Sequence, residues 1–161
     1  FEEISLADLP LVGGKNASLG ELTKELTAQG VSVPRGFAIT VDAYEEILNS
    51  GSVRKDLDQL LRPVFDGDIK DLNLRAQQAR SIIKRAGIPQ PVRDEIISAY
   101  RELSSSYGSQ NLDVAVRSSA TAEDLPDASF AGQQESFLNV QGEEEVLESC
   151  LNCFRIWLLL E

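Results

Sequence analysis

The chain has 161 residues, of which 42% are hydrophobic and 25% charged, a composition that is typical of a globular domain and excludes a wholly disordered chain. Its formal net charge of -11 repels phosphate backbones and anionic lipids, so nucleic acids and membrane surfaces are not expected partners. No apolar run approaches the roughly 20 residues of a membrane-spanning helix, and the first residues lack the pattern of a signal peptide, so we expect a cytoplasmic protein.

Two residue types, methionine and histidine, do not occur in the chain. Because the chain begins with Phe1 and has no methionine, we expect it to be part of a longer protein. The lack of histidine removes imidazole as a general base, a metal ligand or a carrier of a phosphoryl group.

The first 50 residues predict a helix, a strand and a second helix. A glycine turn at Gly13–Asn16 leads into the first helix, which ends at Gly30. A short strand is predicted over Phe37–Thr40, and Thr40 or Asp42 is the expected cap of the second helix. The apolar residues at helical spacing are Leu19, Leu22 and Leu26 in the first helix and Tyr44, Ile47 and Leu48 in the second.

Two amphipathic helices are predicted in the middle of the chain. One begins at Ile69 and ends at Ala86, and the other has Pro91 in its first turn and runs to Leu103. Their apolar positions, three or four residues apart, are Ile69, Leu72, Ala76, Ala79, Ile83 and Ala86 in the first, and Val92, Ile96, Tyr100 and Leu103 in the second. We expect the two helices to pack against each other as a hairpin rather than to form a coiled coil.

The last third of the chain predicts strand, polar segment, strand and helix. Residues 113–118 alternate so that Val114 and Val116 share one face and Arg117 lies on the other. A second strand is predicted over residues 135–140, followed by a turn at Gly142 and a helix through Phe154. The order of elements predicts an α/β (α+β) fold with helices packed on a small sheet.

The C-terminal end contains a Cys-x-x-Cys pair and an apolar tail. Without a histidine or a second pair, Cys150 and Cys153 are expected to be buried thiols rather than metal ligands or a redox centre. We divide the chain into a domain over residues 1–154 and a divergent tail over residues 155–161. Consecutive apolar residues in this tail predict self-association.

The tripeptide Gly13-Gly14-Lys15 has the composition of a phosphate-binding turn. Glycine allows backbone N–H groups to approach an anion, a helix N-terminus favours negative charge, and Lys15 adds a positive charge. The segment is not a Walker A loop, because Leu9 and Asn16 stand where that loop has glycine and serine or threonine. Considered alone, the tripeptide fits a surface turn with a solvated lysine better than a phosphate-binding site.

A second polar segment runs from Arg117 to Glu135. Arg117 offers a planar fork for phosphate oxygens, neighbouring hydroxyls can donate to phosphate, and Gly132 allows close approach of the backbone. The residue chemistry fits equally well a long acidic surface loop with local Ser and Thr hydrogen bonds. Its acids, Glu123, Asp124 and Asp127, favour loop capping or solvation over metal binding, so no metal site is predicted in this chain.

Three stretches carry a resemblance to a known family. Leu11–Glu21 and Val114–Glu135 resemble the two signature segments of the phosphoenolpyruvate synthase family, and Val33–Ala38 resembles its first strand. The resemblance covers nearly the whole chain up to Phe154. It implies the first portion of an ATP-grasp-type nucleotide-binding domain.

The resemblance also implies a reaction and a set of ligand contacts. In the family, ATP with Mg²⁺ phosphorylates a histidine on a separate swivelling domain, water releases one phosphate, and the phosphohistidine passes its phosphoryl group to pyruvate in a third domain. Lys15 and Arg117 match the phosphate-contacting lysine and arginine, and Gly132 matches the glycine of the loop that covers the phosphates. Ser136 stands where a related enzyme has a nucleotide-contacting threonine. No catalytic residue is expected in this chain, which alone should be inactive.

Two other functions are compatible with the sequence. A rifampin-type antibiotic phosphotransferase has a similar nucleotide domain but delivers phosphate to a drug. The run Asn16–Ser18 and Asp127 favour the synthase over this alternative. The third possibility is a non-catalytic remnant that binds nothing, which a titration with ATP distinguishes from a nucleotide-binding unit.

Overall fold

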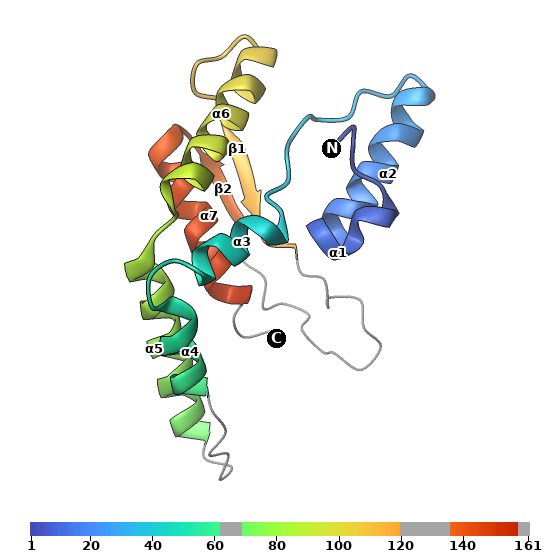
Figure 1. The fold of residues 1–161 in the computed structure, drawn as a ribbon. Helices are drawn as coiled ribbons and strands as arrows, with labels where there is room; N and C mark the ends of the chain where they lie inside the picture. The colour runs from blue at the N-terminus through green and yellow to red at the C-terminus, as the bar shows by residue number, and fades with distance from the viewer. Residues whose placement is uncertain (62–68, 120–135, 158–161) are drawn as a thin grey trace.

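The computed structural model describes residues 1–61, 69–119 and 136–157 of the chain (Figure 1). In chain order the elements are the 3₁₀ helix η1 (Leu6–Asp8), the helices α1 (Leu9–Val12), α2 (Gly14–Ala28), α3 (Val41–Leu48), α4 (Val53–Leu61), α5 (Ile69–Ala86) and α6 (Gln90–Ser106), the strands β1 (Val114–Arg117) and β2 (Ser136–Val140), and the helix α7 (Glu143–Trp157). Helices packed on a small antiparallel sheet confirm the predicted α+β class. Within these ranges no helix combines the length and apolar character that a membrane span requires.

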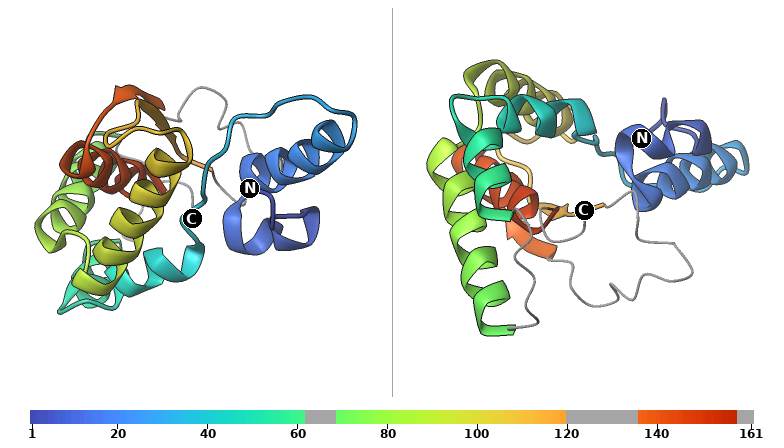
Figure 2. Two further views of the ribbon diagram at one scale, coloured as in Figure 1. Left: turned by 90° about the horizontal axis from the view of Figure 1, so that it is seen from above. Right: turned by 60° about the horizontal axis from the view of Figure 1, so that its bottom comes forward.

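Helix α7 forms the centre of the main body. It packs against α5 and α6 and against both strands, while α3 contacts α4 and α5 (Figure 2). The buried core residues are Tyr44, Ile47, Leu48, Val53, Leu57, Ala79, Ile83, Val92, Ile96, Tyr100, Val140, Val146, Leu147, Cys150 and Phe154. In both figures α1 and α2 lie to one side of this body. Burial of the core side chains therefore stabilises α3–α7 and the sheet more directly than it stabilises α2.

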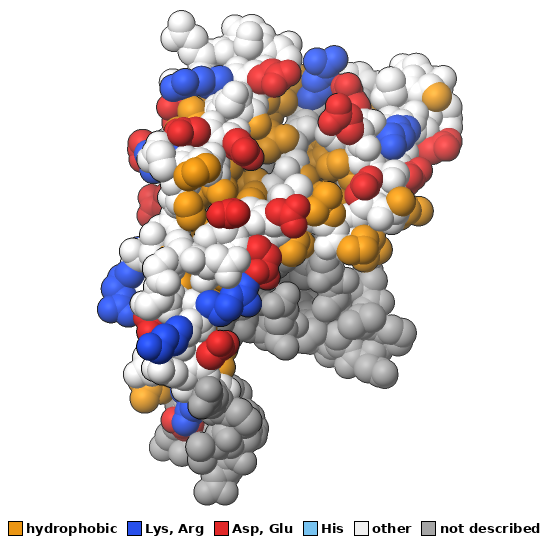
Figure 3. Space-filling view, viewed as in Figure 1, with side chains coloured by type: hydrophobic (Ala, Val, Ile, Leu, Met, Phe, Trp, Pro, Cys, Tyr) orange, Lys and Arg blue, Asp and Glu red, His pale blue; other side chains and the backbone are white. Residues whose placement is uncertain are grey.

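Large apolar side chains are exposed near the N-terminal helices. Leu6 is 57% exposed, and Leu9 and Leu11 are more than one-third exposed. In Figure 3 apolar and acidic side chains stand next to each other on this side of the molecule. The segment η1–α2 therefore has a mixed apolar and acidic surface.

Helices α5 and α6 form where the apolar spacing predicts them. On α6 the buried residues Val92, Ile96, Tyr100 and Ser104 follow one another at intervals of four, and Pro91 lies in the first turn, where a missing N–H costs nothing. The predicted hairpin of α5 and α6 is wrong, because α5 packs against α4 and α7, whereas α6 packs against α7. Gly87, with φ of 70°, and the extended Pro89 let α6 continue beyond α5 instead of folding back (Figure 1).

Helix α4 was not predicted from the sequence, and it supplies the partner of α5. Its buried residues Val53 and Leu57 are four positions apart, and the partly buried Leu60 extends this stripe. The rest of the helix is largely charged or polar, so the apolar signal is short. The helical hairpin of this protein is therefore α4–α5.

The predicted strand at Phe37–Thr40 is also wrong, because this segment has no regular secondary structure. A strand needs a neighbour that accepts and donates ladder hydrogen bonds. In the described part of the chain, the sheet consists of β1 and β2 alone. Phe37 and Ile39 nevertheless pack against the core, which explains the alternating apolar pattern. Thr40 occupies the predicted N-cap position of α3, although its side chain makes no cap hydrogen bond.

The two strands pair in antiparallel register, with Val114 opposite Val140 and Arg117 opposite Ser136. An irregularity in the pairing falls between Val114 and Val116, and Asn139 on β2 has φ of 56°. This φ lies in the left-handed region, which asparagine tolerates better than most residues. Because Arg117 pairs with Ser136, the end of β1 lies opposite the start of β2.

Burial of Cys150 and Cys153 confirms the prediction of buried thiols, because both side chains are less than 10% exposed. Desolvation, reinforced by the neighbouring Cys153, raises the pKa of Cys150 to about 12. The pKa of this thiol is higher in the folded state than in the unfolded state. Its contribution to the stability of the fold is therefore fully present below about pH 9 and is lost as the pH rises toward 12.

We therefore expect Cys150 to resist alkylation in the folded protein. At pH 8 its thiolate fraction is about a thousandfold below that of an unfolded thiol. Iodoacetamide labelling of a Cys153→Ala variant, followed by mass spectrometry with and without denaturant, measures this difference. Equal labelling rates in the two conditions would contradict the burial of this thiol.

Residues 158–161 and the side chains of residues 155–157 lie outside the described part of the chain. Self-association through residues 155–161 therefore stays a prediction.

Candidate functional site

The first candidate segment turns the chain from α1 into α2. Gly13 occupies the N-cap position of α2 with φ of 78° and ψ of 163°, a conformation essentially restricted to glycine. Gly14 begins the helix, and Lys15 follows in the first turn with a half-buried side chain. The first N–H groups of a helix have no intrahelical partner, and the helix dipole favours negative charge at this end. The segment can therefore offer both backbone donors and an ammonium group to an anion.

The second candidate segment begins at the end of β1. As the alternation predicts, Val114 and Val116 are partly buried against the core, whereas Arg117 is exposed. The Arg117 Nε donates a hydrogen bond of 3.3 Å to the Ser136 hydroxyl on the paired strand. Two of the predicted site residues, 19 positions apart in sequence, therefore lie side by side.

Ser119 joins the two segments. Its hydroxyl accepts a hydrogen bond of 3.3 Å from the backbone N–H of Asn16, across 103 positions of the chain. Gly13 lies against the same serine: a Cβ built on Gly13 would stand 2.5 Å from the Ser119 carbonyl oxygen and 2.6 Å from its hydroxyl oxygen. We call these interactions of Ser119 with Gly13 and Asn16 the Ser119 contact.

The Ser119 contact completes the cap of α2. Gly13 has no side chain with which to accept a hydrogen bond from the first helical turn, and a serine from a distant part of the chain accepts one instead. The Asn16 side chain adds a second link, since its Nδ2 donates to the Val12 carbonyl at 2.9 Å. Two hydrogen bonds thus fix the glycine turn: one from the Asn16 backbone N–H to Ser119 and one from the Asn16 side chain to the Val12 carbonyl.

Three of the four predicted ligand residues lie in the described part of the chain. Lys15 is in the first turn of α2, while Arg117 and Ser136 are neighbours on the sheet. Gly132 lies outside the described residues. Ser119 was not predicted as a link, because no local pattern reveals a hydrogen bond that joins positions so far apart in sequence.

Ser118, between Arg117 and Ser119, is 4% exposed. Its hydroxyl has no hydrogen-bond partner among the described residues. Buried hydroxyls usually have a hydrogen-bond partner, so Ser118 is an exception among the described residues and places a buried polar group at the end of β1.

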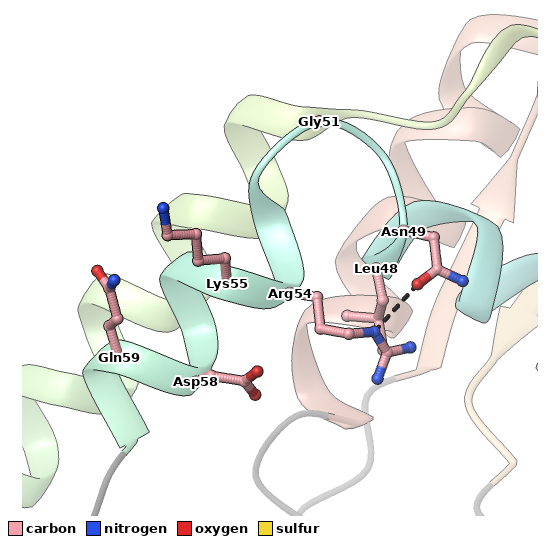
Figure 4. A pocket seen from close by; sticks show the side chains of 7 residues that line it. All are labelled: Leu48, Asn49, Gly51, Arg54, Lys55, Asp58 and Gln59. Atoms are coloured by element: carbon pink, nitrogen blue, oxygen red, sulfur yellow. Dashed lines mark hydrogen bonds between the residues drawn. The ribbon is translucent and has the colours of Figure 1, made fainter.

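A surface hollow of about 440 Å³ lies at the corner between α3 and α4 (Figure 4). Its lining residues are Leu48, Asn49, Gly51, Arg54, Lys55, Asp58 and Gln59. Arg54 points toward Asn49 and donates a 3.0 Å hydrogen bond to it, whereas Lys55 and Gln59 project away (Figure 4). The hollow contains none of the residues predicted to bind phosphate. Of its two cationic lining residues, Arg54 is paired with Glu45 and Lys55 projects away from the hollow (Figure 4).

The described residues contain no group of three or more His, Cys, Asp or Glu side chains that could hold a metal ion.

A glycine turn at a helix N-terminus, a lysine in the first turn and an arginine at the end of a strand are features typical of the class of proteins that bind phosphate-bearing ligands. Comparison with known proteins narrows this class. Residues 9–159 match the family model described as pyruvate phosphate dikinase, AMP/ATP-binding domain, and the chain belongs to this family.

Similar curated proteins carry the name phosphoenolpyruvate synthase. The chain is 45% identical to the one from Aquifex aeolicus over 154 residues, which cover 96% of the chain and 18% of that protein. It is 47% identical to the one from Helicobacter pylori over 153 residues, with 95% and 19% covered, and 44% identical to the one from Escherichia coli over 154 residues, with 96% and 19% covered.

The chain thus spans about a fifth of the length of these relatives. The matches confirm the resemblance to the phosphoenolpyruvate synthase family and do not favour the antibiotic phosphotransferase.

Proposed function

We propose that this chain binds the phosphates of ATP through Lys15 and Arg117, as the ATP-binding part of a phosphoenolpyruvate synthase. The observation that supports the proposal best is the Ser119 contact. It joins the helix turn that carries Lys15 to the end of the strand that carries Arg117. The two cationic side chains come from the segments with the resemblance to the family, and these segments meet in the folded chain.

The two cations suit different parts of this task. Lys15 provides a compact charge beside backbone N–H donors, and Arg117 provides a planar fork that can contact two phosphate oxygens at once. Ser136 contributes a hydroxyl next to Arg117, and Gly132 is proposed to let the backbone approach the phosphates. These groups supply position and positive charge for phosphoryl transfer, in which charge spreads over the phosphate oxygens.

Magnesium is part of this proposal, because a chain with a net charge of -11 needs positive charge around a polyphosphate. We also propose that the complete domain, with residues 1–154 as its first portion, is of the ATP-grasp type. The short segment 155–161 is proposed to lie outside this portion and to mediate self-association.

The longer protein is proposed to phosphorylate pyruvate with ATP and water. This chain contains no histidine, so the phosphoryl-carrying histidine would belong to another part of that protein. Pyruvate would likewise meet the phosphoryl group outside this chain. The isolated chain is thus a nucleotide-binding unit without turnover of its own.

We expect Arg117→Lys to weaken binding of MgATP to the chain about tenfold. Lysine keeps the positive charge but loses the fork, and a charge-assisted hydrogen bond contributes about 1.5 to 3 kcal/mol. Isothermal titration calorimetry with the 161-residue chain measures the change.

Arg101→Lys is the matched control for this substitution. Arg101 is also exposed, and its fork binds the carboxylate of Glu143 at 2.6 and 3.1 Å, with no contact to the proposed site. Its replacement should leave the dissociation constant for MgATP within about twofold, because exposed ion pairs contribute little. An unchanged constant in Arg117→Lys would argue against Arg117 as a phosphate ligand.

A further inference from the structure

We propose that Ser119 is a positioning residue, which sets the distance between the Lys15 and Arg117 side chains through the Ser119 contact. The inference rests on the proposed function, because it assigns a role in ATP binding. It concerns a residue that does not itself need to touch the nucleotide.

The place of Ser119 in the chain links it to both cations. It stands two positions after Arg117, and its hydroxyl accepts from the backbone N–H of Asn16, the residue that follows Lys15. The side chain is 6% exposed, so water competes little for this hydrogen bond. A shift of Ser119 would therefore change the position of Arg117 relative to the first turn of α2.

The packing of α2 makes this contact more important. The principal helix contacts of α2 are with η1 and α1, and α1 in turn contacts α3. The side of α2 that carries Ala17, Gly20 and Thr23 is buried, but the core that surrounds α7 does not include α2 residues. Within residues 1–61, 69–119 and 136–157, the Ser119 contact is thus a direct link between the first turn of α2 and the end of β1.

Because Gly13 has no side chain, the turn before α2 can approach Ser119 closely. With a Cβ at 2.5 Å from the Ser119 carbonyl oxygen, no larger residue fits without displacing the backbone of one of the two segments. The hydrogen bond to Asn16 and the glycine approach act at the same serine from adjacent points of the turn. Two independent features therefore hold Ser119 in one position.

The experiment compares Ser119→Ala with Ser104→Ala in the 161-residue chain. Ser104 is a matched control, because it is 1% exposed and its hydroxyl also accepts a backbone N–H, that of Leu112, at 3.3 Å. Titration with MgATP should show about a tenfold weaker affinity for Ser119→Ala and less than a twofold change for Ser104→Ala. Ser119→Thr, which keeps the hydroxyl, should restore most of the affinity.

A double-mutant cycle separates positioning from general stability. If Ser119 acts by placing Lys15, Ser119→Ala should weaken ATP binding less than about twofold when Lys15 is already alanine, because coupled residues are not additive. Hydrogen exchange of the Asn16 amide, followed by NMR without nucleotide, should become faster in Ser119→Ala and stay unchanged in Ser104→Ala.

The outcomes distinguish this inference from the function on which it rests. Equal effects of Ser119→Ala and Ser104→Ala on ATP affinity, full additivity with Lys15→Ala, or an unchanged exchange rate at Asn16 would each overturn the positioning role alone. Unchanged ATP binding in both Lys15→Ala and Arg117→Ala, or no binding by the unsubstituted chain, would overturn the proposed function and this inference with it.

Discussion

Replacing Gly13 with alanine is expected to destabilise the protein by about 2 to 6 kcal/mol. A non-glycine residue at φ of 78° and ψ of 163° costs about 1 to 3 kcal/mol of backbone strain. The added Cβ would also stand 2.5 Å from the Ser119 carbonyl oxygen, and overpacking of this kind costs about 1 to 3 kcal/mol more. Urea denaturation followed by circular dichroism measures the loss.

Gly30→Ala separates the two contributions. Gly30 has φ of 80°, close to that of Gly13, but a Cβ there meets no atom within 4 Å. We therefore expect only the strain of a left-handed residue, about 1 to 2 kcal/mol. If both alanine variants lose the same free energy of unfolding, the close approach of Gly13 to Ser119 is not a significant constraint.

Tyr100→Phe is expected to destabilise the protein by about 2 to 6 kcal/mol. The Tyr100 side chain is 1% exposed, and its hydroxyl donates to the Leu112 carbonyl at 2.8 Å and accepts from the Gly142 N–H at 2.9 Å. Phenylalanine keeps the ring packing but removes the shared partner of two backbone groups, and each buried unpaired group costs about 1 to 3 kcal/mol. Thermal and urea unfolding measure the change.

Tyr107→Phe is the control for the loss of a hydroxyl. Tyr107 is 49% exposed, and its hydroxyl accepts from the Arg35 N–H at 2.8 Å. Water can replace this exposed interaction, so the free energy of unfolding should change by about 0.5 kcal/mol or less. A similar loss in the two variants would mean that the hydrogen bonds of the Tyr100 hydroxyl to Leu112 and Gly142 do not contribute as described.

Helices α5, α6 and α7 and the strand β1 could be predicted from the sequence because each carries its own periodic pattern. The intervals of three and four among Ala79, Ile83 and Ala86 and the alternation of Val114–Arg117 depend only on backbone geometry. The candidate ligands Lys15 and Arg117 could likewise be proposed from the sequence, because residue type and a long resemblance to the family point to them.

Element pairing required the folded chain, because it depends on contacts between residues far apart in sequence. The segment Phe37–Thr40 has the composition of a strand, yet in the described residues no strand pairs with it. Helix α5 could have packed on either neighbour in sequence, and the short apolar stripe of Val53 and Leu57 on α4 covers it.

Local pattern thus specified which residues form most helices and strands of this protein and which side chains could contact phosphate. Folding specified that α5 pairs with α4, that Ser136 lies beside Arg117, and that Ser119 caps the helix of Lys15. The physical reason is that periodicity reports which face of an element is buried, whereas the partner of that face is set by packing and hydrogen bonds across as many as 103 positions of the chain.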